Sequence, residues 1–128
     1  MTSTHEEVAR AFSGHRFEDA FAHLSDDVRW VSVGDAVLVG RAAVEAACRA
    51  TAEQLVGVTT TFSRFVSVAS GDVAVVDVVA TYDGPDGVVG VSSCDIYEFS
   101  GDLVTTITSY TVMVDPSDPG APAATIDT

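Results

Sequence analysis

The spacing of hydrophobic residues changes along this chain near Gly57. Before that point apolar residues mostly recur every three or four positions, as in helices, and after it long apolar runs follow, as in strands. The pattern predicts helices over residues 4–14, 17–24 and 40–55, short strands over 28–33 and 36–39, and long strands over 58–69, 73–82, 88–99 and 103–114.

The ends of these elements carry residues that favour such ends. Thr4 and Glu7 form a capping box for the first helix, which Gly14 can end. The third helix carries charges of alternating sign, which predict a solvated face: Arg41, Glu45, Arg49 and Glu53. Gly, Asp and Pro gather between the long strands, so we expect these four strands to form an antiparallel meander.

We expect a single domain over residues 1–114 and a flexible tail over residues 115–128. The strand over 73–82 carries valines on both faces, whereas an antiparallel sheet with one wet face would alternate more cleanly. Helices can cover only one side of the sheet well. We therefore expect a second subunit to cover the other side, in a homodimer.

Composition and charge narrow the possible partners and the location. The formal net charge is −13 and all six basic residues are arginines, which argues against binding to nucleic acid or to an anionic membrane. No apolar run approaches the roughly 20 residues that span a bilayer, and the N-terminus lacks the pattern of a signal peptide. Cys48 and Cys94 form no CxxC pattern, so we expect two reduced thiols in a cytoplasmic protein.

The sequence gives no sign of a metal or a cofactor. It contains no Walker loop and no GxGxxG or GxSxG motif, and His5, His15 and His23 lack metal-ligand spacing. We expect neither a metal nor a cofactor, and we place the histidines on the surface of the first two helices. Tyr82 lies near a turn and is expected to be exposed.

Two carboxylates interrupt apolar strands and are the main chemical signal. Asp77 lies within Val73–Tyr82, and Asp95 lies within Val91–Phe99. Burying an unpaired carboxylate is costly, and acid–base sites use groups held in such surroundings. Asp95 is the leading catalytic candidate. The alternative is a carboxylate that bonds Ser or Thr hydroxyls on adjacent strands and fixes their register.

The turn over 83–87 decides whether the two carboxylates meet. A three-residue loop pairs Asp77 with Asp95 on one face, whereas a two-residue loop pairs Asp77 with Cys94 and turns Asp95 to the other face. The sequence leaves both open. Arg64 would lie opposite Asp77 if the turn at 70–71 is tight, either as a cation that orients a substrate or as half of a structural ion pair.

Three segments give the chain a family resemblance. They are Phe21-Ala-His-Leu-Ser-Asp-Asp-Val-Arg-Trp30, Gly40-Arg-Ala-Ala-Val44 and Cys94-Asp-Ile-Tyr-Glu-Phe99-Ser-Gly-Asp-Leu-Val104. With the order of the predicted elements, they resemble the SnoaL-like proteins of the nuclear transport factor 2-like superfamily over about residues 4–114. The resemblance implies an α+β fold, a cone in which three N-terminal helices pack on a curved, mainly antiparallel sheet around an apolar cavity.

The resemblance also implies roles for residues of the last two long strands. Asp95 matches the protonated acid that ketosteroid isomerases keep in an oxyanion hole, and Tyr97 would then face the cavity by alternation. Continuing through the turn at 100–102 places Thr108 and Tyr110 on the same face.

The chain departs from the two mechanisms that the resemblance offers. The general base of the isomerases would fall near Ser32, and their oxyanion tyrosine near Val8. The Arg-x-Asp pair of the epoxide hydrolases does not occur on the second long strand, and their last-strand aspartate would fall near Thr108.

Two hypotheses follow. The first is a cofactor-independent enzyme of isomerase, cyclase or epoxide-hydrolase type that acts on a hydrophobic, oxygenated small molecule. Its catalytic candidates are Asp95, Asp77, Arg64 and Tyr110, and its substrate-binding candidates are Trp30, Phe62, Tyr97 and Thr108. The second hypothesis is a non-catalytic ligand-binding or dimerisation module with the same fold.

Overall fold

The computed structural model describes residues 4–124, and residues 1–3 and 125–128, the latter part of the predicted tail, lie outside the described residues. The described part is an α+β domain of three helices and seven strands. The elements are α1 (His5–Ser13), α2 (Phe17–Phe21), β1 (Leu24–Ser32), β2 (Ala36–Val39), α3 (Arg41–Gln54), β3 (Thr59–Ser70), β4 (Val73–Gly84), β5 (Gly87–Ser100), β6 (Leu103–Asp115) and β7 (Asp118–Pro122).

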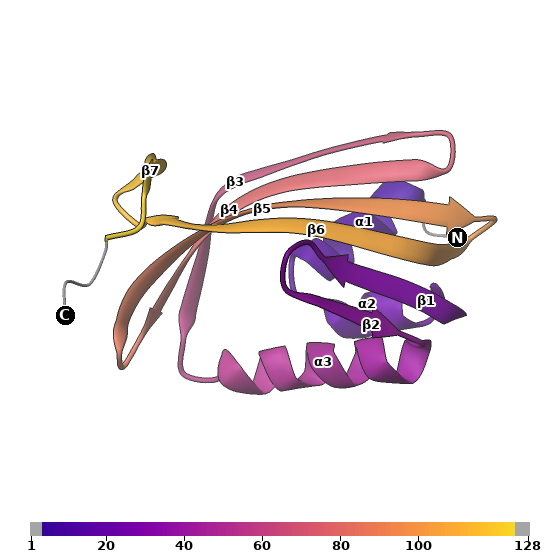
Figure 1. Cartoon of the computed structure of the whole chain (residues 1–128), viewed down its shortest axis with the longest axis horizontal. Coiled ribbons are helices and arrows are strands. Elements are labelled where there is room, and N and C mark those ends of the chain that lie inside the picture. The colour runs from indigo at the N-terminus through magenta and orange to yellow at the C-terminus, as the bar shows by residue number, and fades with distance from the viewer. Residues whose placement is uncertain (1–3, 125–128) are drawn as a thin grey trace.

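The strands form one mixed sheet in the order β2-β1-β6-β5-β4-β3, with β7 paired to β6 at the end of the chain. All neighbouring strands run antiparallel except β1 and β6. Figure 1 shows the long strands bending together, with α3 running beside β1 and β2. Helix α1 contacts β3, β4 and β5. The meander predicted for the four long strands is confirmed.

Two predicted boundaries differ from the structure. The second helix ends at Phe21, and Leu24 already belongs to β1, because its side chain packs in the core as the first residue of a strand beside Val104. In the segment predicted as a flexible tail, residues 118–122 form β7 and pair with β6.

The side chains of β4 point alternately to the two faces of the sheet and so distinguish them. Ala74, Val76, Val78 and Ala80 are buried against the helices. Their alternating neighbours point to the opposite side, which we call the outer face. The core continues on β5 and β6 through Tyr97 and Ile107, both 0% exposed, so the helices cover one side of the sheet only.

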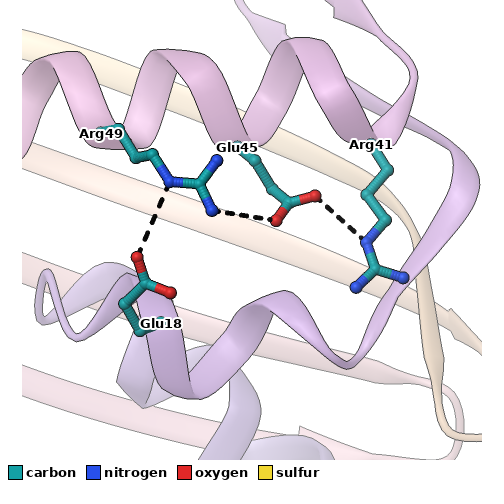
Figure 2. A network of polar contacts seen from close by, with 4 residues as sticks. All are labelled: Glu18, Arg41, Glu45 and Arg49. Atoms are coloured by element: carbon teal, nitrogen blue, oxygen red, sulfur yellow. Dashed lines mark hydrogen bonds and ion pairs between the residues drawn. The ribbon is translucent and has the colours of Figure 1, made fainter.

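An ion-pair network ties α2 to α3 at the edge of the core. Arg49 lies 3.8 Å from Glu18 on α2 and 3.5 Å from Glu45, which also pairs with Arg41 at 3.2 Å (Figure 2). The Arg49 guanidinium also lies 5.1 Å from the centre of the Phe21 ring. The predicted solvated face of α3 is thus partly used for packing, since the Glu45 side chain is only 19% exposed.

No helix in residues 4–124 is both long enough and apolar enough to span a membrane.

Candidate active site

A pocket of about 300 Å³ lies between the helices and the covered face of the sheet. Its apolar wall consists of Phe12, Phe17, Trp30, Val78, Ala80 and Val91. Its polar lining consists of Ser13, His15, Ser32, Thr51, Tyr82, Ser93, Asp95, Ser109 and Thr111. Most of the pocket's surface is therefore apolar, with polar groups at a few points, as in many sites for small molecules.

Asp95 is the carboxylate of this pocket, and three serine hydroxyls hold it. Ser13 donates to Oδ2 at 2.7 Å, while Ser109 and Ser93 donate to Oδ1 at 2.7 and 3.3 Å. Ser109 is the cross-strand partner of Asp95 on β6, and Ser13 ends α1. Hydrogen bonds to a carboxylate are among the stronger ones in proteins, so both oxygens are fixed in position.

Two further side chains extend the hydrogen bonding away from Asp95. Because the single Ser13 hydrogen goes to Asp95, Tyr97 donates its own hydroxyl hydrogen to Ser13 at 2.5 Å. On the other side, the Trp30 indole Nε1 donates to Ser109 at 2.9 Å. Burial, with the nearby charge of Asp95, raises the pKa of Tyr97 well above its usual value, so Tyr97 stays protonated as this chain of donors requires.

The carboxylates do not share a face, so the hypothesis of an Asp77–Asp95 pair is wrong. Gly84 pairs with Gly87, which leaves a two-residue loop, and Asp77 therefore pairs with Cys94 on the outer face. There Asp77 accepts a hydrogen bond from Arg64 Nε at 2.8 Å. The predicted ion pair is confirmed, although Arg64 lies opposite Val79 and not opposite Asp77 as predicted. Both side chains lie outside the pocket, partly exposed.

Tyr110 and Thr108 also lie on the outer face, contrary to prediction. Between β5 and β6 the pairing passes from Phe99–Val104 to Glu98–Thr106, so Thr105 is an extra residue in the ladder. A one-residue bulge moves every later side chain to the opposite face. It turns Ser109 toward the pocket in place of Thr108 and leaves Tyr110 half exposed.

The other predicted binding residues lie at or near the pocket. Trp30 lines it, and Tyr97 lies beneath it as the fully buried partner of Ser13. Phe62 points to the covered face of the sheet but is not a lining residue, and its ring centre lies 5.8 Å from that of His15. The binding roles themselves remain predictions.

Sequence reasoning missed His15 and Tyr82, which both line the pocket. His15 follows Gly14 with a φ of 64°, and this left-handed turn points its ring toward Phe17 and Tyr82, with ring centres 5.4 and 6.0 Å away. Burial lowers the pKa of His15, and the charge of Asp95 opposes that shift. Burial, with the Asp95 charge, raises the pKa of Tyr82.

Weak signals for both residues were present in the sequence. Left-handed residues often follow the last turn of a helix, and histidine is enriched among non-glycine residues that adopt this conformation. Tyr82 continues the alternation of Val78 and Ala80, which places it on the covered face.

The cysteines offer no nucleophile to the pocket. Cys48 is fully buried in the core, where burial raises the pKa of its thiol to about 12. Cys94 lies on the outer face, and burial also raises the pKa of its thiol. Both are free thiols, and within residues 4–124 no group of three or more His, Cys, Asp or Glu side chains is placed to hold a metal ion.

Comparison with known proteins places the fold. The model of the SnoaL-like domain matches residues 5–107. No curated protein matches the chain in sequence. An NTF2-like protein of unknown function from Cytophaga hutchinsonii is 29% identical, with a TM-score of 0.74 over 84% of this chain and 96% of that chain.

Two more distant structures share the fold. A candidate polyketide cyclase from Xanthomonas campestris is 16% identical, with a TM-score of 0.63 over 80% of this chain and 83% of that chain. A candidate ketosteroid isomerase from Kribbella flavida is 21% identical, with a TM-score of 0.58 over 96% of this chain and 81% of that chain. The expected α+β, NTF2-like fold is therefore confirmed.

Proposed function

The chain belongs to the SnoaL-like domain family, and from this premise we propose that it is a small-molecule enzyme doing acid–base chemistry without a cofactor. Its substrate is hydrophobic and oxygenated, and it binds in the pocket that contains Asp95. Isomerisation, aldol-type cyclisation and epoxide opening all need a proton to move at or beside an oxygenated carbon. All three fit this proposal, and solved structures of the same fold include a candidate cyclase and a candidate isomerase.

The observation that carries the proposal is the setting of Asp95. A carboxylate fixed by three serine hydroxyls borders a largely apolar cavity of about 300 Å³. An apolar wall binds the carbon skeleton of a ligand, while a fixed charge can stabilise a proton or a positive charge that develops during reaction. Asp77, Arg64 and Tyr110 lie outside the pocket and have no part in the proposed chemistry.

A matched pair of substitutions tests the proposal. Bicyclic ketones and epoxides form the substrate panel, and turnover is followed by NMR for the wild type, Asp95→Asn and Asp77→Asn. Loss of one preorganised electrostatic group typically costs about 10²–10³-fold in rate, so D95N should lose activity on this scale. D77N carries the same change on the outer face and should keep the wild-type activity. Equal losses in the two variants would contradict the proposal.

A second candidate function is a ligand-binding module without catalysis. It is favoured by the completeness of the network, because within residues 4–124 no buried side-chain nitrogen or oxygen lacks a hydrogen-bond partner. Asp95 would then be a structural carboxylate that orders β5 and β6. Tight binding of the panel without any turnover by the wild type would favour this alternative.

We also propose that two copies associate through the outer face and that the protein is cytoplasmic. The first proposal is supported by the exposed valines of that face, and the second by two free cysteines.

A further inference from the structure

The surrounding structure fixes the position of His15 at the pocket, although His15 belongs to no helix or strand. It lies between α1 and α2, with a φ of 64° that is uncommon for a residue with a side chain. Its backbone N–H donates to the Phe12 carbonyl at 3.1 Å, which fixes the turn. The aromatic rings of Phe17, Phe62 and Tyr82 surround the imidazole, with ring centres 5.4–6.0 Å away.

The charged and titratable groups around His15 come from three elements. Among the lining residues, Asp95 on β5 and Tyr82 on β4 are the titratable side chains that share the pocket with it. On the helical side, its neighbour Arg16 is exposed and pairs with Asp19 at 3.8 Å. The imidazole is therefore the nitrogen base that faces the cavity.

We propose that His15 is the residue that takes a proton from the substrate and returns it, with Asp95 acting on it as a fixed negative charge. This inference rests on the proposed function and names the base of that same site. Both Asp95 oxygens are engaged by serine hydroxyls, whereas among residues 4–124 no side-chain hydrogen bond is found for the His15 ring nitrogens. Burial lowers the pKa of His15, so its neutral, proton-accepting form prevails near pH 7.

The proton-transfer step balances within the site. A C–H bond next to a carbonyl breaks, its proton goes to a free imidazole nitrogen, and its electron pair forms an enolate. The Tyr82 hydroxyl, which burial keeps protonated, is available to donate a hydrogen bond to the enolate oxygen. The imidazolium, stabilised by Asp95, then returns the proton to the same or another carbon.

Exchange of the α-protons of 2-tetralone in D₂O tests this role without knowledge of the natural substrate. His15→Asn is suitable because asparagine tolerates the left-handed turn but cannot act as a base. The wild type should accelerate exchange, and H15N should lose about 10²-fold or more of that acceleration. Its binding of 2-tetralone, followed by NMR shifts, should change little. His23→Asn makes the same change away from the pocket lining and should behave as the wild type.

The dependence on pH gives an independent readout. Wild-type exchange should rise with pH as the His15 imidazolium loses its proton, and the imidazole NMR signal of His15 should titrate over the same range. In D95N the pKa of His15 should fall further, because the charge that opposes the burial effect is gone.

The outcomes separate the two levels of the argument. Exchange that persists in H15N but is lost in D95N overturns the role of His15 and leaves the proposed function standing. A His15 signal with an ordinary pKa, unaffected by D95N, also overturns that role. If 2-tetralone binds and the wild type does not accelerate exchange, the proposed function fails and the role of His15 fails with it.

Discussion

Ser13 supports two polar groups at the base of the pocket, and its removal has a predictable cost. Ser13→Ala deprives Tyr97, whose side chain is fully buried, of its acceptor and deprives Asp95 of one donor. An unpaired buried polar group typically costs about 1–3 kcal/mol, so S13A should lower the free energy of unfolding by about that amount. Urea denaturation followed by circular dichroism measures the change.

The double variant Ser13→Ala/Tyr97→Phe separates the lost hydrogen bond from a packing defect. Tyr97→Phe removes the hydroxyl that S13A leaves without a partner, so the double variant should recover part of the lost stability. If the double variant is less stable than S13A by the full cost of Y97F alone, the Tyr97–Ser13 bond contributes nothing.

His15 should make stability depend on pH. Its folded pKa lies below the value of about 6.5 in unfolded chains, so the unfolded state binds a proton more readily. The stabilising contribution is complete above about pH 6.5 and is lost as pH falls through the lowered pKa of the folded state. Thermal unfolding of the wild type should therefore shift to lower temperature below about pH 6.5, and more steeply than that of H15N.

The slope of unfolding temperature against pH is compared between the wild type and H15N, which cancels the contributions of the other titrating groups. His5, His23 and the carboxylates are common to the two proteins, so only the difference between the slopes reports on His15. Parallel pH profiles for the wild type and H15N would contradict the prediction.

At the scale of elements, the spacing of hydrophobic residues predicted the long strands. Which side chains meet depended instead on the number of residues in each loop and bulge. Asp95 was identified from its place in an apolar strand. Whether Asp77 joined it depended on a loop of two residues, which the sequence left open against a loop of three. The bulge at Thr105 carries no clear sequence signal, and for that reason Tyr110 and Thr108 were placed on the wrong face.

Deleting Thr105 should leave the later side chains of β6 on the faces that they occupy now. Without Thr105, the pairs Phe99–Val104 and Glu98–Thr106 become successive pairs of a regular ladder, so Ile107 and Ser109 stay on the covered face. Ile107 stays buried and Ser109 keeps its hydrogen bond to Asp95. The deletion variant should therefore remain folded by circular dichroism.

Thr105→Ala is the matched control for the deletion. It keeps the bulge and removes only the exposed hydrogen bond to the Glu98 carbonyl, at 3.2 Å, so its stability should stay within about 0.5 kcal/mol of the wild type. A deletion variant that unfolds while T105A stays folded would contradict this reading of the bulge.

At the scale of the whole molecule, the two faces of the sheet differ in how far they are covered. The helices cover one face, and the outer face leaves apolar side chains of several strands in contact with solvent. These exposed side chains include Val37, Val39, Val66, Val68, Val73, Tyr110 and Val112. A patch of this kind on a small domain is typical of an interaction surface. The pattern along residues 73–82 predicted that the second face would need a cover.

A second copy of the chain is the occupant that we expect on this face. Arg64 and Asp77 lie within the patch with their charges partly exposed, so two copies related by a two-fold axis could place each charge near its opposite. Each subunit carries a formal net charge of −13, which disfavours close approach elsewhere on the surface. Apolar contact with paired charges at this face can offset that repulsion.

Val112→Glu tests the association. Val112 lies on β6, on the same outer face as Tyr110, and is 59% exposed. A carboxylate there would have to be desolvated in the interface, so V112E should be monomeric where the wild type is dimeric. Val56→Glu introduces the same charge just after α3, at a side chain that is 80% exposed, and should remain dimeric. Analytical ultracentrifugation at several concentrations measures the mass of each protein. A monomeric wild type, or a V112E that sediments as V56E does, would show that the outer face does not join two copies.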